Sequence, residues 1–165
     1  MEIDFRALQV IAEVALGIVG FSAILIALSR SNEGFSKPDN FRIQLLTFSA
    51  FGAMFCALIP FALFNSNNIE ISWYVISIIL GIYSVIGLLI FPRKVIVLRK
   101  EGYADVFPLR IVFIQMGMLA IIFILSGLML VDFIDQKNNV YLFCLILFLI
   151  QSTNAIIRTM FVRVD

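Results

Sequence analysis

The sequence predicts an all-α integral membrane protein, a single bundle of about five transmembrane helices. Of its 165 residues, 62% are apolar and 14% are charged, and the mean hydropathy is +1.06. A soluble domain of this size has about 45–50% apolar and about 25% charged residues. A short chain cannot hide such an excess in one core, because its surface is too large relative to its volume. Lipid is therefore the solvent that the apolar residues require.

Five apolar segments are long enough to cross a bilayer, which takes about 20 residues of helix. They cover residues 7–29, 41–64, 71–91, 109–131 and 140–162. Turn-forming or polar residues separate them: Gly34 and Pro38, Asn65–Asn68, Pro92 and Pro108, and Asp132–Asn139. The first segment is too long for the apolar part of a cleavable signal peptide, so we expect it to stay as the first span. The whole chain, residues 1–165, then forms one transmembrane domain.

The positive charges predict the orientation of the bundle. With five spans, only Arg6 and Lys137 of the 12 lysines and arginines fall on one side of the membrane, and the other ten fall on the opposite side. Lysine and arginine near short loops remain cytoplasmic during insertion. We therefore expect the N-terminus outside and the C-terminus inside.

The first span carries a polar and glycine-rich face. Gln9, Glu13, Gly17 and Gly20 recur at spacings of three and four residues, so they share one side of a helix. An ionisable group in hydrocarbon is costly, so Glu13 requires protein or water beside it. One interpretation is a pore lining, in which copies of Glu13 form an acidic ring that attracts cations. The other is a packing seam, in which the glycines admit a neighbouring helix and Glu13 is protonated.

The last span carries a second polar stripe in its cytoplasmic half. Gln151, Asn154 and Arg158 lie at positions i, i+3 and i+7. The stripe could line the inner mouth of a pathway, or its members could form hydrogen bonds between helices while Arg158 reaches the headgroups. Three polar side chains of other spans are expected at a similar depth: Gln44, Thr47 and Gln115.

Pro60 lies inside the second span and has no amide hydrogen to donate to the carbonyl of Cys56. A kink is expected there. It could act as a gating hinge, or it could be a structural proline of the kind that membrane helices tolerate.

The connection from Pro92 to Pro108 is strongly basic. Arg93 and Lys94 precede an apolar run, and Arg99 and Lys100 follow it, which suits a segment at the anionic inner leaflet. The same charges could hold a nucleotide, an oligonucleotide or an acidic partner. No glycine-rich phosphate loop accompanies them, so a nucleoside-triphosphate site is not supported.

Enzymatic chemistry finds no candidates in the sequence. The chain has no histidine, and its two cysteines lie in apolar runs without the basic neighbours that activate a thiolate. Glu13 is the only acid inside a span, so no pair of carboxylates is available there. We expect no catalytic residue, no metal site and no cofactor.

The segment Ala12–Ala23 resembles the opening span of small bacterial multi-pass membrane proteins, and Arg42–Leu46 and Pro60 fit the same likeness. Some minimal proteins of this kind resemble the membrane effector of Hailong-type antiphage defence systems. That resemblance implies an oligomeric ion channel in the bacterial inner membrane. It also implies a cytoplasmic nucleotide or oligonucleotide ligand, supplied by a partner nucleotidyltransferase, which would meet the basic inner face.

The sequence therefore favours a homo-oligomeric channel or pore-forming effector in the lipid bilayer. Five helices are too few to enclose a wide aqueous path, and closed cyclic symmetry among identical subunits would supply one. The alternative is a non-catalytic accessory or scaffold subunit of a larger membrane complex, with its polar faces buried against partner helices.

Overall fold

The computed structural model describes residues 3–30, 36–64 and 68–161. Within these residues the chain forms five α-helices and no strand: α1 (Phe5–Arg30), α2 (Lys37–Leu63), α3 (Ile69–Lys100), α4 (Leu109–Leu130) and α5 (Lys137–Phe161). All five are long and apolar enough to cross a membrane. The prediction of an all-α membrane bundle with five spans is confirmed.

The helix ends agree with the predicted spans to within four residues, except at the end of α3. Pro92 was expected to begin the connection after the third span, but α3 continues through it as a helix to Lys100. A proline removes one intrahelical hydrogen bond, and a long helix can absorb that loss. Pro38 was also misplaced, since it lies in the first turn of α2, where its missing amide hydrogen is no loss. Gly34, Asn65 and Arg163 lie outside the described residues.

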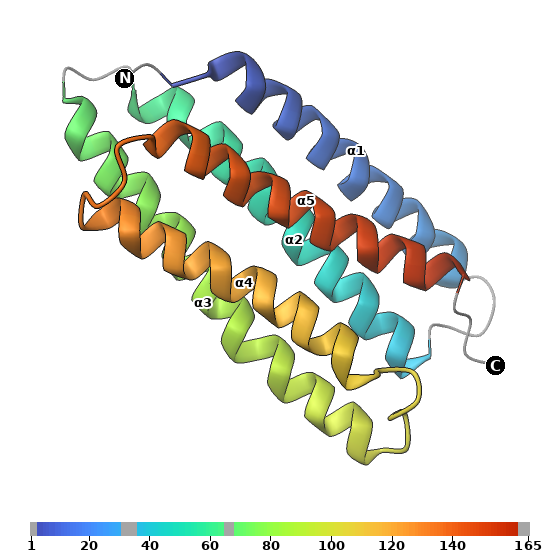
Figure 1. Ribbon diagram of the computed structural model, residues 1–165. Helices are drawn as coiled ribbons and strands as arrows, with labels where there is room; N and C mark the ends of the chain where they lie inside the picture. The colour runs from blue at the N-terminus through green and yellow to red at the C-terminus, as the bar shows by residue number, and fades with distance from the viewer. Residues whose placement is uncertain (1–2, 31–35, 65–67, 162–165) are drawn as a thin grey trace.

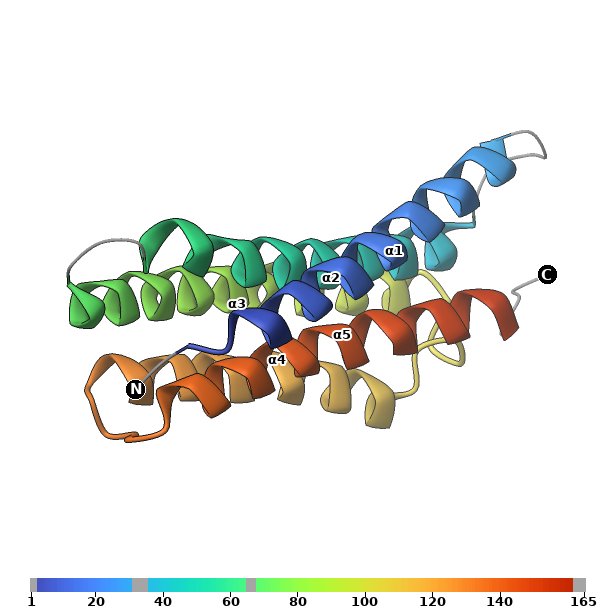
Figure 2. The same cartoon turned by 90° about the horizontal axis from the view of Figure 1, so that it is seen from above.

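The helices form a four-membered ring with a fifth helix outside it. Each of α2, α3, α4 and α5 packs on the next, and α5 packs back on α2. The remaining helix, α1, lies against α2 and α5 at the edge of the bundle (Figure 1). Its C-terminal part is angled away from α5 (Figure 2). This arrangement leaves much of α1 without a neighbour.

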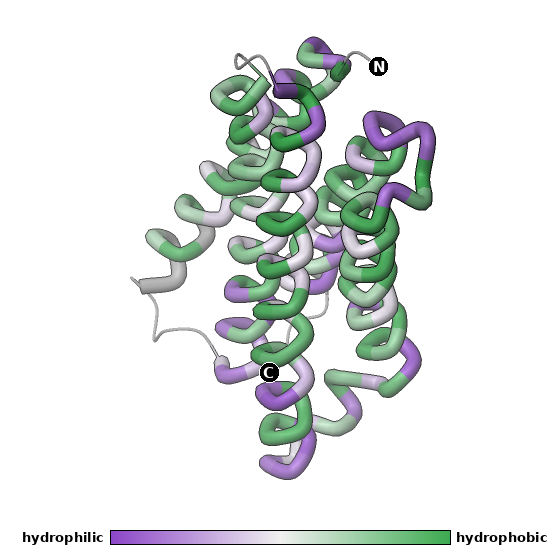
Figure 3. Tube along the Cα trace, turned by 90° about the vertical axis from the view of Figure 1, so that its left-hand side faces the viewer, coloured by the Kyte–Doolittle hydropathy of each residue, from purple (hydrophilic) through white to green (hydrophobic). Residues whose placement is uncertain are grey.

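The outside of the bundle is apolar, as contact with lipid requires. Large apolar side chains are exposed along the helices, among them Phe113 at 72%. Hydrophilic residues gather mainly near the two ends of the helices (Figure 3). A soluble protein would not expose so much apolar surface. We call the end that carries Lys37, Arg93, Arg99 and Arg158 the basic end.

The centre of the bundle is α2, of whose most apolar stretch 50% is buried, compared with 22% for α4. Tyr83 of α3 holds it by a hydrogen bond, 2.7 Å long, from its hydroxyl to the carbonyl of Phe48. The Tyr83 ring also stacks on Phe48 and meets Phe148 of α5 edge-on. A Cβ atom at Gly52 would lie only 2.4 Å from this ring. The glycine therefore makes room for a side chain that fixes α3 on α2.

The helix α2 is also tied to α5 beside Pro60, which lies within the helix as predicted. Because Pro60 has no amide hydrogen, the carbonyl of Cys56 lacks its usual partner within the helix. The hydroxyl of Tyr141, a fully buried residue of α5, donates a hydrogen bond to this carbonyl. The Tyr141 hydroxyl thus replaces the hydrogen-bond donor that Pro60 lacks. The same hydrogen bond fixes α5 against α2 at the level of Pro60. A gating hinge at Pro60 stays a prediction.

Replacing Tyr141 with phenylalanine is expected to lower the free energy of unfolding by about 1 kcal/mol, because the carbonyl of Cys56 is then buried without a donor. Unfolding in detergent, followed by circular dichroism, measures the change. Tyr74→Phe is the matched control, since the Tyr74 side chain is 44% exposed. In a Pro60→Ala background the amide returns, so Tyr141→Phe should cost less there. Equal stability of Tyr141→Phe and the unmodified protein would contradict this role.

Candidate functional site

The polar face predicted for the first span exists on α1 and is exposed. Its four residues are exposed on the outer surface of the bundle: Gln9, Glu13, Gly17 and Gly20. A Cβ atom at either glycine would meet nothing within 4 Å. The helix packs on the bundle with a different set of side chains: Leu8, Ile11, Ala12 and Ala15. The predicted face is thus left open by the five-helix unit.

Glu13 borders a hollow of about 290 Å³ between α1 and α2. Gln9 shares the hollow, and its Nε2 atom donates a hydrogen bond of 2.9 Å to Oε1 of Glu13. The other lining residues are apolar: Ala12, Leu16, Met54, Leu58 and Phe61. In the part of the chain that the structure describes, Glu13 forms no ion pair. A carboxyl group in such a setting needs water or a further protein surface beside it.

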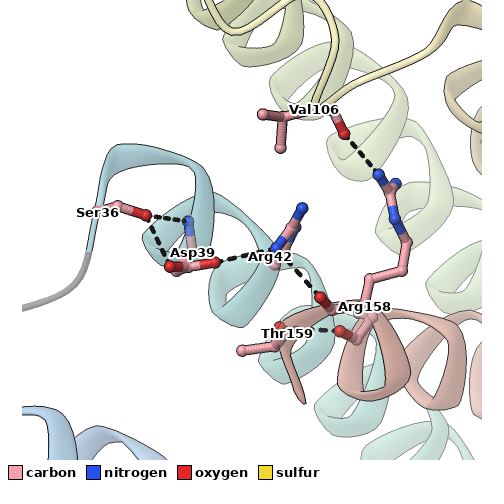
Figure 4. Close-up of polar contacts among 7 residues, drawn as sticks. Ser36, Asp39, Arg42, Val106, Arg158 and Thr159 are labelled. Atoms are coloured by element: carbon pink, nitrogen blue, oxygen red, sulfur yellow. Dashed lines mark hydrogen bonds and ion pairs between the residues drawn. The ribbon is translucent and has the colours of Figure 1, made fainter. Parts of the chain in front are cut away.

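A second polar cluster lies at the basic end, where Arg42 and Arg158 form hydrogen bonds with neighbouring segments (Figure 4). It surrounds the buried ring of Phe107. Nη1 of Arg42 is 3.0 Å from Oδ1 of Asp39 and donates a hydrogen bond to the carbonyl of Arg158. Nη2 of Arg158 in turn donates to the carbonyl of Val106, 2.6 Å away. Both guanidinium groups lie 5.9 Å from the centre of the Phe107 ring. The cluster joins α2, α5 and the connection between α3 and α4.

The contacts of Arg42 were not predicted from the sequence. The spacing that places it was visible, because Ser36, Asp39 and Arg42 follow one another at intervals of three residues. Ser36 caps α2 by accepting a hydrogen bond from the amide of Asp39. Asp39 then lies one turn before Arg42 and within reach of its guanidinium group.

The three residues of the predicted inner stripe of α5 differ in burial and in the groups that they contact. Gln151 is fully buried, and neither atom of its amide group has a hydrogen-bond partner among the described residues. Asn154 is half-buried, and Arg158 belongs to the cluster around Phe107. Among the described residues, the five-helix bundle therefore leaves no opening to Gln151, and access to this side chain requires movement of the helices.

The depth of Gln151 follows from the antiparallel packing of α5 on α2. The bond from Tyr141 to Cys56 and the bond from Arg42 to Arg158 bracket it along the two helices. Counting inward from either contact places Gln151 level with the stretch of α2 near residues 46–49. Two buried hydroxyl groups there also lack a partner within the described residues: Thr47 and Ser49. Side-chain polar atoms without a hydrogen-bond partner among the described residues thus occur at a similar depth on α2 and α5.

The four basic residues predicted to hold an anion lie in different surroundings. Arg93 and Lys94 lie on the exposed side of α3 and line a groove against α2. Arg99 instead donates a hydrogen bond to the carbonyl of Phe107. This bond joins the last turn of α3 to the end of the connection that leads to α4. Lys100 is exposed but does not line the groove. Of the four, the groove is lined only by Arg93 and Lys94.

Comparison with protein-family models, with curated proteins and with solved structures finds no match for this chain. In residues 3–30, 36–64 and 68–161, no group of three or more acidic or cysteine side chains is placed to hold a metal ion.

Proposed function

We propose that several copies of this protein assemble in a bacterial inner membrane as an ion channel or pore-forming effector. The copies are arranged around an axis with the open face of α1 directed inward. Glu13 and Gln9 then border the outer part of the ion path, and Gly17 and Gly20 let neighbouring helices approach. The observation that carries the proposal is the exposure of this face on a membrane-spanning helix.

The exposed position of Glu13 argues against an isolated protomer in lipid. Without a neighbour, the carboxyl group and its hollow would face hydrocarbon, at a cost of several kcal/mol for the charged form. A second copy or a water-filled path removes that cost. Neither glycine contacts a neighbouring helix in the protomer. Small residues on an open face of a membrane helix are typical of helix–helix contacts.

The packed interior of one protomer favours an ion path between copies over a path through a single copy. The ring of α2, α3, α4 and α5 is filled with fully buried side chains, among them Leu80, Leu119 and Phe148. Among the described residues, these buried apolar side chains give a path through one protomer no polar lining at their positions. Cyclic symmetry places a path on the axis instead. We place control of opening at the basic end, where an anionic ligand arriving from the cytoplasm would meet the basic residues.

Ion flux through liposomes tests the proposal. The reconstituted protein is expected to conduct and to prefer cations, and Glu13→Gln is expected to lower the ratio of cation to anion permeability about fivefold or more. A carboxylate about 4 Å from an ion contributes on the order of 1–4 kcal/mol, depending on the local dielectric. Glu70→Gln is the matched control, because Glu70 is also exposed but lies at the start of α3.

Two results would contradict the proposal. The first is a protein that remains monomeric in lipid discs. The second is identical selectivity of Glu13→Gln and the unmodified protein. A protein that binds a different membrane protein through the α1 face and passes no ions would instead be an accessory or scaffold subunit.

A further inference from the structure

A groove runs along the basic end of the bundle, between the first part of α2 and the last part of α3. Its volume is about 390 Å³. Apolar side chains form part of its lining, including Phe41 and Leu98, which are buried, and Val97, which is 53% exposed. Its polar lining residues are Lys37, Asn40, Gln44, Arg93, Lys94 and Glu101. The groove thus combines an apolar surface with a polar and charged edge.

Two side-chain contacts cross the groove. At one end, Nζ of Lys37 lies 2.9 Å from Oε2 of Glu101, and these two charges compensate each other. Further along, Nζ of Lys94 donates a hydrogen bond to Oε1 of Gln44, which is neutral. Arg93 forms no hydrogen bond or ion pair with any described residue. Three cations against one carboxylate leave the groove with two uncompensated positive charges.

The position of the groove along α3 suits the headgroup region of a membrane. The helix has 32 residues, so it is about 48 Å long, compared with about 30 Å for the hydrocarbon layer. About a dozen residues must therefore extend beyond the hydrocarbon. The charges of α3 show which end extends, because Arg93, Lys94, Arg99 and Lys100 all follow Pro92. Arg93 and Lys94 then lie at the depth of lipid phosphates, and basic side chains there attract anionic lipids.

We propose that this groove binds one anionic phospholipid per protomer. Arg93 and Lys94 hold the phosphate group, and Gln44 releases Lys94 or shares it with the lipid. The amide of Asn40 lies near enough to the same edge to contact the headgroup, and an acyl chain lies along Phe41 and Val97. Lipid binding in this groove does not depend on ion conduction. Its test is therefore independent of the test of the proposed channel.

Native mass spectrometry of the detergent-solubilised protein tests the site. With phosphatidylglycerol added, the protein is expected to retain one lipid per protomer, and with phosphatidylcholine none. The double variant Arg93→Gln/Lys94→Gln is expected to bind phosphatidylglycerol about 30-fold more weakly, since each basic residue near a lipid surface contributes roughly a factor of five. The matched control is Lys100→Gln/Arg110→Gln, which removes one lysine and one arginine from exposed positions outside the groove.

Equal weakening in the two double variants would overturn the proposal, because the attraction would then come from net charge alone. Glycerol phosphate in the millimolar range should not displace the lipid, and displacement would show a site for soluble phosphate esters. Displacement by a short oligonucleotide at micromolar concentration would likewise exclude a lipid as the occupant. If the groove variant does not fold, the unmodified protein still decides the matter. Its melting temperature should rise with phosphatidylglycerol and stay constant with phosphatidylcholine.

Discussion

Arg42→Leu is expected to lower the free energy of unfolding of the bundle by about 3 kcal/mol. The side chain of Arg42 is 3% exposed and that of Asp39 is 15% exposed. Removing one partner of a buried ion pair leaves the other charge buried without compensation. The carbonyl of Arg158 also loses a donor, and Phe107 loses one of the two guanidinium groups above its ring.

Two further variants separate the ion pair from the packing. Arg42→Leu combined with Asp39→Asn should recover much of the loss, because no unpaired charge then remains in the site. Lys37→Leu removes the cation of an exposed pair and should change stability far less, since solvent screens that pair. Chemical denaturation in detergent, followed by circular dichroism, measures all three. If the single variant Arg42→Leu were as stable as the unmodified protein, the cluster around Phe107 would have no structural role.

The membrane fold could be predicted from the sequence because the free energies by which its apolar segments partition into lipid add up. Each apolar run contributes to partitioning into lipid independently of the others, so length and composition are sufficient to find five spans. The error at Pro92 arose because proline was interpreted as a helix end. Within an established helix the lost hydrogen bond is a local cost, and the residues after Pro92 continue the helix to Lys100. The sequence could not show that the basic segment is helical.

The candidate site was predicted in part, for a related reason. Helical spacing correctly placed Gln9, Glu13, Gly17 and Gly20 on one face, because that relation is local to one helix. The role of Arg99 depends on the path of the α3–α4 connection, and the burial of Gln151 depends on the packing of α5 against α2. Both are tertiary relations between segments far apart in the sequence. Periodicity within one helix carries no information about them.

Gly52→Ala is expected to lower the free energy of unfolding by about 2 kcal/mol, although alanine favours helices by about 1 kcal/mol relative to glycine. The new Cβ atom would lie 2.4 Å from the ring of Tyr83, which is closer than any contact that two carbon atoms tolerate. The ring cannot move aside freely, because its hydroxyl bonds to Phe48 and its faces are packed. Overpacking of this kind costs about 1–3 kcal/mol, and the hydrogen bond is lost in addition. Tyr83→Leu in the same background should restore part of the loss, which a double-mutant cycle would show.

The identical substitution at Gly17 should have the opposite effect on the isolated protomer. Nothing lies within 4 Å of the added Cβ atom, so only the gain in helix propensity remains, about 0.5–1 kcal/mol. A larger change, Gly17→Leu, should leave the protomer folded but weaken assembly, because a bulky side chain keeps neighbouring helices apart. Unfolding in detergent measures the first effect, and mass determination in lipid discs measures the second. Loss of assembly in Gly17→Leu with unchanged helical content would assign this glycine to a contact between copies, whereas unchanged assembly would remove the α1 face from the interface.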